Sequence, residues 1–280
     1  MSPHGRPKDE YRSAQHEGTP VTDSILLEAV DLELAAGPRT LASGLSLRIE
    51  AGQCWAVVGA NGVGKTTLLG VLAGLAAPRR GRVELGGRAM ASLRPAEAAR
   101  WRGFLPQHVE ATFDTSVLQS VLLGRHPHRH PGAWRLWESE RDEALARGAL
   151  ARVDLQGFEE RDLSSLSGGE RQRAALAALL AQAPALYLLD EPFAHLDLRH
   201  QHAVMRLLRE LAGAGECAVV ASVHDLSLAA RHATHALVMA PAGCRAGPAG
   251  EVLTEATLSA AFGHPVRRLA DGETVALVGR

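Results

Sequence analysis

The stretch Gly59-Ala60-Asn61-Gly62-Val63-Gly64-Lys65-Thr66-Thr67 decides the fold of this chain. Its pattern, G-x-x-x-x-G-K-[ST], is that of a loop that wraps the phosphates of a nucleoside triphosphate. The apolar run Cys54–Val58 before it is typical of a buried strand, and a helix is predicted after it. This order aims backbone N–H groups and a positive helix end at phosphate. The stretch therefore predicts an α/β fold with a nucleotide site.

Individual residues of this loop have separate expected roles. Gly62 and Gly64 let the backbone approach the phosphates closely, because a Cβ would block that approach. Lys65 is expected to reach the β- and γ-phosphates, and the Thr66 hydroxyl is expected to ligate Mg²⁺. The alternative is a glycine-rich turn with a solvated lysine, which the filled motif and both flanks disfavour.

Two acids, Asp190 and Glu191, follow a second apolar run, Ala185–Leu189. A central parallel strand of this length delivers both carboxylates to the nucleotide edge of the sheet. There we expect Asp190 to complete the Mg²⁺ shell and Glu191 to act as the general base on water. The alternative is a solvated acidic turn.

His224 follows a third buried-strand pattern, Ala218–Val223, and precedes Asp225, a good N-cap for a helix over 226–232. The carboxyl end of that strand points to the same edge of the sheet as Glu191. We expect His224 to donate a hydrogen bond to the γ-phosphate and to fix the water. For a single histidine the alternative is a packing role.

Ser167-Gly168-Gly169 opens a helix that runs toward Gln182 and forms a second anion-binding terminus. One chain has no use for two such termini on one γ-phosphate. Two copies that meet head to tail could each close this terminus over the partner's phosphate loop. The pattern therefore favours a nucleotide-bridged homodimer, with an ordinary helix cap as the alternative.

Taken together, these motifs over about residues 23–262 resemble the nucleotide-binding subunit of ATP-binding cassette transporters. Residues 59–67 match the Walker A motif, 166–170 the signature and 186–191 the Walker B motif. The resemblance implies a mixed sheet with a parallel RecA-like core, an antiparallel β subdomain and an inserted α-helical subdomain. It also implies ATP as substrate, Mg²⁺ as cofactor, a homodimer, and integral-membrane permease subunits with an indirect substrate-binding protein as partners.

The same resemblance implies roles for residues that the chemistry alone does not single out. Gln107 matches the Q-loop, which senses Mg²⁺ and couples the site to the permease. Asp197 matches the D-loop at the dimer interface. Two positions depart from the family: the stretch 34–39 lacks the usual adenine-stacking aromatic, and Ala194 lacks the usual hydroxyl.

Composition agrees with these expectations. The 280-residue chain has a formal net charge of −1, which does not favour nucleic acid as the main partner. The three cysteines lack metal spacing and fit a reduced compartment. No run approaches the roughly 20 apolar residues of a membrane span, and no signal peptide is recognised. We expect a peripheral protein on the cytoplasmic face of the inner membrane, held there through the permease.

The expected organisation has three parts. Residues 1–22 are predicted to be a disordered polar tail, 23–253 the nucleotide-binding domain, and 254–280 a C-terminal helix with short strands. Strand patterns at 25–34 and 45–49 are expected to start the mixed sheet. A helical insert at about 108–165 is expected to hold helices at 116–123 and 138–153 and to dock on the membrane partner.

Within that insert, His126, His128 and His130 stand at alternate positions. Because Pro127 and Pro131 oppose a helix, an extended loop is expected, either solvated for docking or binding a metal. The phrase Gly124–His128 is similar to a segment of the subfamily that powers import of iron–siderophore complexes, haem and cobalamin. The ATPase does not touch the cargo, so the sequence does not choose among these chelates.

Other function classes remain as alternatives. A soluble cassette ATPase of translation, repair or cluster assembly is one, although single-cassette length and the absence of sustained heptads disfavour it. An importer of another substrate class is another. A regulator without turnover is disfavoured by Glu191 and His224, and a GTPase by the absence of an N-K-x-D motif.

Overall fold

The structure is a computed structural model that describes residues 25–108, 115–128, 139–271 and 274–279. The predicted tail 1–22 lies outside the described residues. The strands are β1 (Ile25–Ala36), β2 (Arg39–Glu50), β3 (Cys54–Gly59), β4 (Arg80–Leu85), β5 (Arg88–Ala89), β6 (Arg102–Leu105), β7 (Leu186–Leu189), β8 (Ala218–Ser222), β9 (His235–Ala240), β10 (Gly243–Pro248), β11 (Val266–Asp271) and β12 (Thr274–Gly279). The α-helices are α2 (Lys65–Leu72), α3 (Pro95–Trp101), α4 (Val117–Leu122), α5 (Glu140–Arg152), α6 (Gly168–Gln182), α7 (Leu198–Gly213), α8 (Leu226–His232), α9 (Ala249–Val252) and α10 (Glu255–Phe262). Short 3₁₀ helices lie at Met90–Ser92, Leu123–His128 and Leu163–Ser165.

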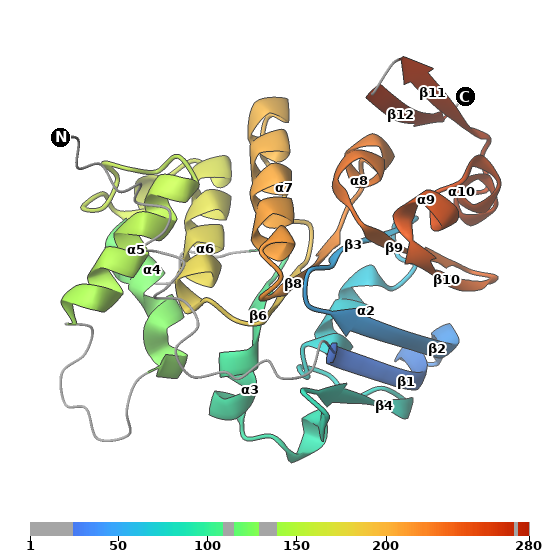
Figure 1. Cartoon of the computed structure of the whole chain (residues 1–280), viewed down its shortest axis with the longest axis horizontal. Coiled ribbons are helices and arrows are strands. Elements are labelled where there is room, and N and C mark those ends of the chain that lie inside the picture. The colour runs from blue at the N-terminus through green and yellow to red at the C-terminus, as the bar shows by residue number, and fades with distance from the viewer. Residues whose placement is uncertain (1–24, 109–114, 129–138, 272–273, 280) are drawn as a thin grey trace.

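A six-stranded mixed sheet in the order β10-β9-β3-β8-β7-β6 forms the centre of the molecule (Figure 1). Its strands run parallel except β10, which pairs antiparallel with β9. Every residue of β3, β7 and β8 is buried, as expected for strands that are covered on both faces. The predicted α/β class and the three strands before the polar motifs are confirmed.

The N-terminal strands form a separate antiparallel sheet in the order β2-β1-β4-β5. The antiparallel β subdomain that the family resemblance implies is confirmed, but the expectation that the patterns at 25–34 and 45–49 start the mixed sheet was wrong. Both strands alternate between buried and more exposed residues, so each offers one apolar face rather than two. A strand with one apolar face suits an antiparallel sheet that packs one face on the core and exposes the other. It does not suit a parallel sheet that is covered on both faces.

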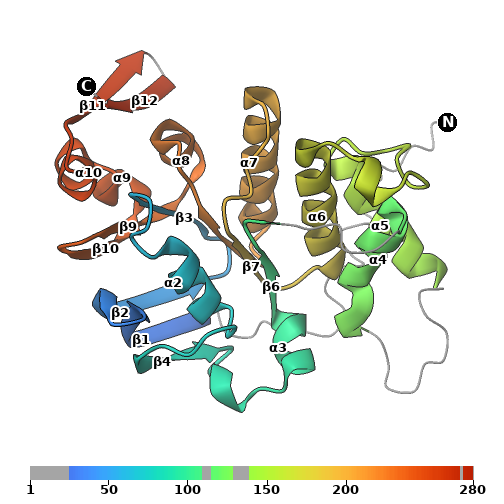
Figure 2. The ribbon, with the colours of Figure 1, turned by 180° about the vertical axis from the view of Figure 1, so that it is seen from behind.

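Two hydrophobic clusters lie on the two faces of the central sheet. Trp55 and Val57 of β3 pack with α2 and the antiparallel sheet. Cys54, Ala56 and Val58, which alternate with them, pack in the cluster that includes α4, α5, α6, α7 and α8. The period of two along β3 thus supplies both cores at once. Figure 2 shows α4, α5 and α6 grouped at the end of the molecule opposite β1, β2 and β4.

The helical insert departs from expectation at the histidine segment. Residues 123–128 form a 3₁₀ helix rather than an extended loop, although they include Pro127. Gly124 lies directly against the Ala178 carbonyl of α6, an approach that a side chain would prevent. His128 donates from Nε2 to the Gln182 carbonyl oxygen at 2.7 Å, and burial lowers the pKa of His128. Contacts with α6 therefore override the local preference, and His128 is not part of a solvated loop.

The C-terminal elements match the pattern expected for them. Helix α10 covers the predicted range 255–262, and β11 pairs antiparallel with β12. The Ser227 hydroxyl of α8 accepts a hydrogen bond from the Leu277 backbone N–H at 3.0 Å. This contact ties the C-terminal hairpin to the helix that follows His224.

Candidate nucleotide-binding and catalytic site

The carboxyl ends of four neighbouring strands meet at one edge of the central sheet. The register places Val57 of β3 beside Ser222 of β8, Ala221 beside Leu189 of β7, and Leu189 beside Leu105 of β6. The phosphate loop, the acidic pair, His224 and Gln107 follow these ends directly. Parallel register therefore brings together motifs that are far apart in the sequence.

The phosphate loop joins β3 to α2 and ends in a helix N-terminus. Gly64 is the N-cap of α2 with φ of 114°, and Gly62 has φ of 73°, so both use backbone space that glycine reaches freely. Lys65 is buried, and its Nζ donates to the carbonyl oxygens of Gly59 at 2.8 Å and Ala60 at 3.3 Å. Burial lowers the pKa of Lys65, opposed by the charges of Glu191 and Asp190. The ammonium thus lies inside the loop and near both acids, while Thr66 is exposed beside it.

We expect Gly59→Ala to destabilise the fold more than Gly62→Ala. A Cβ on Gly59 would lie 2.5 Å from the Met239 carbonyl oxygen of β9, whereas a Cβ on Gly62 meets nothing within 4 Å. The expected loss of unfolding free energy is about 3 kcal/mol for Gly59→Ala and about 1 kcal/mol for Gly62→Ala. Denaturant unfolding of both variants measures this difference, and equal losses would contradict the close packing of the loop on β9.

Asp190 is buried at 1 % exposure and has two unequal carboxylate oxygens. Oδ1 accepts a hydrogen bond from the Ser222 hydroxyl at 2.7 Å. Oδ2 is buried and has no hydrogen-bond partner among the described residues. A buried carboxylate oxygen without a donor is costly unless a cation or donor reaches it, and such an oxygen is a ligand that Mg²⁺ prefers. The arrangement therefore fits a divalent cation held by Asp190.

Glu191 lies between Gln107 and His224. Gln107 donates from Nε2 to Glu191 Oε2 at 2.9 Å, and His224 Nε2 lies 2.6 Å from Glu191 Oε1. Each carboxylate oxygen thus has its own partner, one from the end of β6 and one from the end of β8. The backbone of Glu191 has φ of 48°, a left-handed conformation that is strained for a residue with a side chain. Strain of this kind is common where a side chain must face a substrate.

Sequence reasoning missed one residue of this site, Ser222. Its hydroxyl contacts Asp190 and also accepts the Glu191 backbone N–H at 2.7 Å. The available signal was a serine in the otherwise apolar run Ala218–Val223. A polar side chain at the end of a fully buried strand needs partners, and here both partners belong to the acidic pair.

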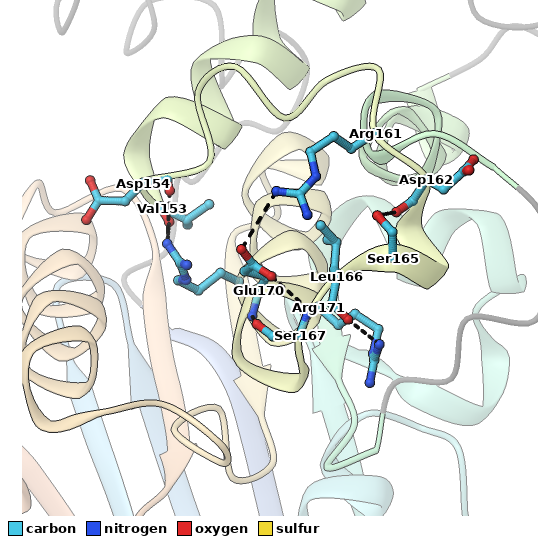
Figure 3. Close-up of polar contacts among 10 residues, drawn as sticks. Val153, Asp154, Arg161, Asp162, Ser165, Leu166, Ser167, Glu170 and Arg171 are labelled. Carbon is cyan, nitrogen blue, oxygen red and sulfur yellow. Dashed lines mark hydrogen bonds and ion pairs between the residues drawn. The ribbon is translucent and has the colours of Figure 1, made fainter.

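The signature residues begin α6 and are held by a capping box. Ser167 is the N-cap; its hydroxyl accepts the Glu170 backbone N–H at 3.3 Å, and Glu170 Oε2 accepts the Ser167 backbone N–H at 2.7 Å. That backbone hydrogen bond lowers the pKa of Glu170. Figure 3 shows Arg161 reaching toward Glu170, with a separation of 3.9 Å between Nη1 and Oε1. The helix start is therefore fixed before any ligand arrives.

Arginines on α6 hold the start of this helix and join it to the helical insert. Arg173 donates from Nη1 to the carbonyl oxygens of Val153 and Asp154, both at 2.9 Å, and Arg171 donates to the Leu166 carbonyl oxygen (Figure 3). The Leu166 side chain is buried, whereas Ser167 is exposed. The signature serine thus lies exposed at the start of α6, next to the segment that the arginines anchor.

The predicted D-loop lies against the signature glycines of the same chain. A Cβ on Gly169 would lie 2.8 Å from the His195 carbonyl oxygen, and one on Gly168 would lie 3.5 Å from His195 Cβ. Asp197 is the N-cap of α7 and accepts from the backbone N–H and Nδ1 of His200, both at 2.8 Å. The backbone hydrogen bond lowers the pKa of Asp197.

Figures 1 and 2 both show α6 and α2 on different sides of α7, so the two anion-binding termini are apart within one chain.

Two further expectations concern ligands. Trp55 is buried at 4 % exposure and stacks on His235 at 4.8 Å between ring centroids, so it is a core residue and not an adenine platform. His130 lies outside the described residues. Within the described ranges no group of three or more His, Cys, Asp or Glu side chains is placed to hold a metal ion. None of the helices in these ranges has the length and apolar composition of a membrane span.

Comparisons with known proteins agree with this geometry. The family described as ABC transporter matches residues 42–194. A protein of Streptomyces coelicolor named hemin import ATP-binding protein HmuV is 42% identical over 255 residues, covering 91% of this chain and 89% of the relative. A Halobacterium salinarum protein named cobalamin import ATP-binding protein BtuD is 42% identical over 234 residues, covering 83% of this chain and 57% of the relative.

A solved structure supports the same assignment. A metal-chelate type ABC transporter in an inward-facing conformation superposes with a TM-score of 0.78 at 29% identity, covering 92% of this chain and 98% of the solved chain. The family match extends over more than half of the chain and includes the phosphate loop, the signature and the acidic pair. The chain therefore belongs to the ABC transporter family, in which it is an ATP-hydrolysing subunit.

Proposed function

We propose that this chain powers an importer of a metal chelate such as haem, cobalamin or an iron–siderophore complex from the cytoplasmic face of the cell membrane. The observation that carries the proposal is the 42% identity to a hemin import ATP-binding protein over 91% of this chain. The structural similarity to a metal-chelate type ABC transporter supports the same cargo class. None of the nucleotide-site residues is assigned a contact with the cargo, so the proposal names only the class of chelate.

In the proposed reaction, the phosphate loop and Lys65 hold ATP. The first backbone N–H groups of α2 point at the phosphates, and the Lys65 ammonium exchanges its carbonyl partners for phosphate oxygens. The Thr66 hydroxyl and Asp190 Oδ2 are the ligands that we assign to Mg²⁺, with Gln107 as an additional ligand once it leaves Glu191. When bound, Mg²⁺ neutralises charge on the β- and γ-phosphates. The burial of Asp190 and its oxygen without a partner support this assignment.

Glu191 is the proposed general base, and His224 is the proposed donor to the γ-phosphate. Both side chains already meet at the sheet edge, where His224 Nε2 lies 2.6 Å from Glu191 Oε1. A base acts on water within about 3 Å, so Glu191 must exchange at least one of its present contacts for that water. Gln107 and His224 are therefore placed to respond to the nucleotide and to release the carboxylate.

We further propose that two copies sandwich ATP head to tail. Ser167, Gly168 and Gly169 form a helix terminus that is apart from the phosphate loop of its own chain (Figure 1). In this arrangement the phosphate loop of the second copy would face this terminus, and Asp197, two residues after the His195 that lies against the signature glycines, would lie at the interface. Closure of this homodimer would move the permease subunits, and a substrate-binding protein would deliver the chelate to them.

The experiment is capture of membrane partners by the full chain carrying Glu191→Gln, purified from membranes with ATP. We expect a polytopic permease at stoichiometric yield, and the sequence of that permease would identify the cargo class.

The docking face is tested with Leu123→Asp in the helical insert, where Leu123 is 55% exposed. This variant is expected to lose the permease at least about tenfold while still binding ATP, because a buried charge opposes an apolar interface.

The matched control is Leu75→Asp, which places the same charge at a leucine that is 62% exposed and lies outside the insert. This variant should retain the permease. Recovery of soluble partners alone, with an ATP-bound dimer intact, would replace the importer by a soluble cassette ATPase. Equal loss of permease in both leucine variants would overturn the helical insert as the docking face.

A further inference from the structure

Ser222 is a polar side chain in the interior of this protein. Among the residues that the structure describes, the buried polar or charged side chains are those of Lys65, Gln172, Asp190 and Ser222. Ser222 has 0 % exposure and is the last residue of β8, next to the sheet edge where the nucleotide site forms. A hydroxyl without access to water must satisfy its donor and its acceptors within the protein.

Ser222 meets this need by contacting both acids through different groups. A carboxylate only accepts, so the Ser222 hydroxyl donates its single proton to Asp190 Oδ1, at 2.7 Å. A backbone N–H only donates, so the same oxygen accepts from Glu191 N, at 2.7 Å. One oxygen atom therefore joins a side chain of the acidic pair to the main chain of its neighbour.

The first consequence concerns the direction of the Asp190 carboxylate. Because Oδ1 is held by Ser222, rotation of the carboxylate would break a hydrogen bond in a site from which water is excluded. Oδ2, the oxygen with no hydrogen-bond partner among the described residues, is thereby kept in one orientation. Partners of this kind set the orientation of a ligand before the metal arrives.

The second consequence concerns the backbone of Glu191. Its φ of 48° is a left-handed conformation that is strained for a residue with a Cβ, so surrounding contacts must stabilise it. The hydrogen bond from Glu191 N to Ser222 acts on the strained residue itself. It fixes the point from which the Glu191 side chain starts toward Gln107 and His224.

We propose that Ser222 is a positioning residue that sets Asp190 for metal binding and Glu191 for base catalysis with one hydroxyl. The proposal rests on the roles given to Asp190 and Glu191 in the proposed function. It adds a fully buried residue that acts through those two acids.

The test compares Ser222→Ala and Ser222→Thr in the full-length chain, with ATP turnover and nucleotide binding measured separately. Ser222→Ala is expected to lower kcat by about 10–100-fold and to raise the Mg²⁺ concentration needed for half-maximal ATP binding by about tenfold. ATP affinity measured in EDTA should stay within about twofold of wild type, because the phosphate loop is untouched. Ser222→Thr keeps the hydroxyl and should recover most of the Mg²⁺ response.

Thr234→Val is the matched control for a merely structural hydroxyl. The Thr234 hydroxyl accepts the Cys54 backbone N–H at 2.9 Å and lies at the opposite end of β3 from the phosphate loop. This variant should lose thermal stability without a change in the Mg²⁺ requirement. If Ser222→Ala behaves as Thr234→Val does, the positioning role is overturned. Failure of the wild-type chain and its permease complex to hydrolyse ATP would instead overturn the proposed function.

Discussion

The Glu191→Gln variant is expected to bind ATP as the wild type does and to hydrolyse it about 10²–10⁴-fold more slowly, which is the usual contribution of a positioned general base. The amide has nearly the shape of the carboxylate but cannot take a proton from water. Because hydrolysis is what separates the proposed dimer, the variant should also accumulate as an ATP-bound dimer. Single-turnover hydrolysis and size-exclusion chromatography with ATP measure the two effects.

The two side-chain contacts of Glu191 also affect how readily the proposed dimer closes. Glu191 accepts from Gln107 Nε2 at 2.9 Å and lies 2.6 Å from His224 Nε2. A glutamine at 191 offers one oxygen and one NH₂ group, so it can accept from only one of these two partners in the same way. We therefore expect the Gln107 side chain or the His224 ring to turn toward the nucleotide more readily, which favours the closed dimer.

The control is Glu210→Gln on the exposed face of α7, where Glu210 pairs with Arg206 at 3.8 Å. Exposed ion pairs of this kind contribute about 0–1 kcal/mol, so turnover should not change. Wild-type turnover by Glu191→Gln would show that another group takes the proton. A fall in turnover without an ATP-bound dimer would keep the base but refute the head-to-tail arrangement.

The Lys65→Ala variant is expected to lose ATP binding, by about 100-fold or more, and to lose turnover with it. The Lys65 ammonium is buried and donates to Gly59 and Ala60 in the loop. A charge-assisted hydrogen bond contributes roughly 1.5–3 kcal/mol. The loss of two such bonds between Lys65 and phosphate therefore accounts for a fall in ATP affinity of this size. Equilibrium binding of a fluorescent ATP analogue, with competition by ATP, measures it.

Arg48→Ala serves as the comparison, because Arg48 is a cation on the antiparallel sheet whose side chain is 56% exposed and pairs with Glu28 at 3.0 Å. Its removal should leave ATP affinity unchanged. Retention of micromolar or tighter ATP affinity by Lys65→Ala would contradict the phosphate-loop assignment. A loss of affinity in both variants would indicate general charge attraction instead of a specific contact.

Much of the local structure followed from short patterns in the chain. The runs before Gly59, Asp190 and His224 are apolar and bounded by turn residues, and each forms a strand of the central sheet. Helix α8 covers the range 226–232 that was predicted after the Asp225 N-cap. These features depend on residues within a few positions of each other, so local propensity and burial are enough to predict them.

Other features depended on contacts between distant residues. The assignment of β1 and β2 to a separate sheet required their pairing with each other and with β4. The 3₁₀ helix over 123–128 required the close approach of Gly124 to α6. Neither is encoded by a period of two or 3.6 within the segment, so local sequence reasoning predicted the wrong arrangement in both places.

By itself, the sequence determined the chemical inventory of the site: a phosphate loop, an acidic pair, a histidine at a strand end and a second anion-binding helix terminus. Only the tertiary structure decided how these groups meet. The Gln107 contact with Glu191 spans 84 positions, and the Ser222 contact with Asp190 spans 32. Such contacts arise because parallel strands set the ends of separate segments in register at one edge of the sheet. A pattern within one segment carries no information about that register. The contacts of Ser222 with both acids could therefore be seen only in the folded protein.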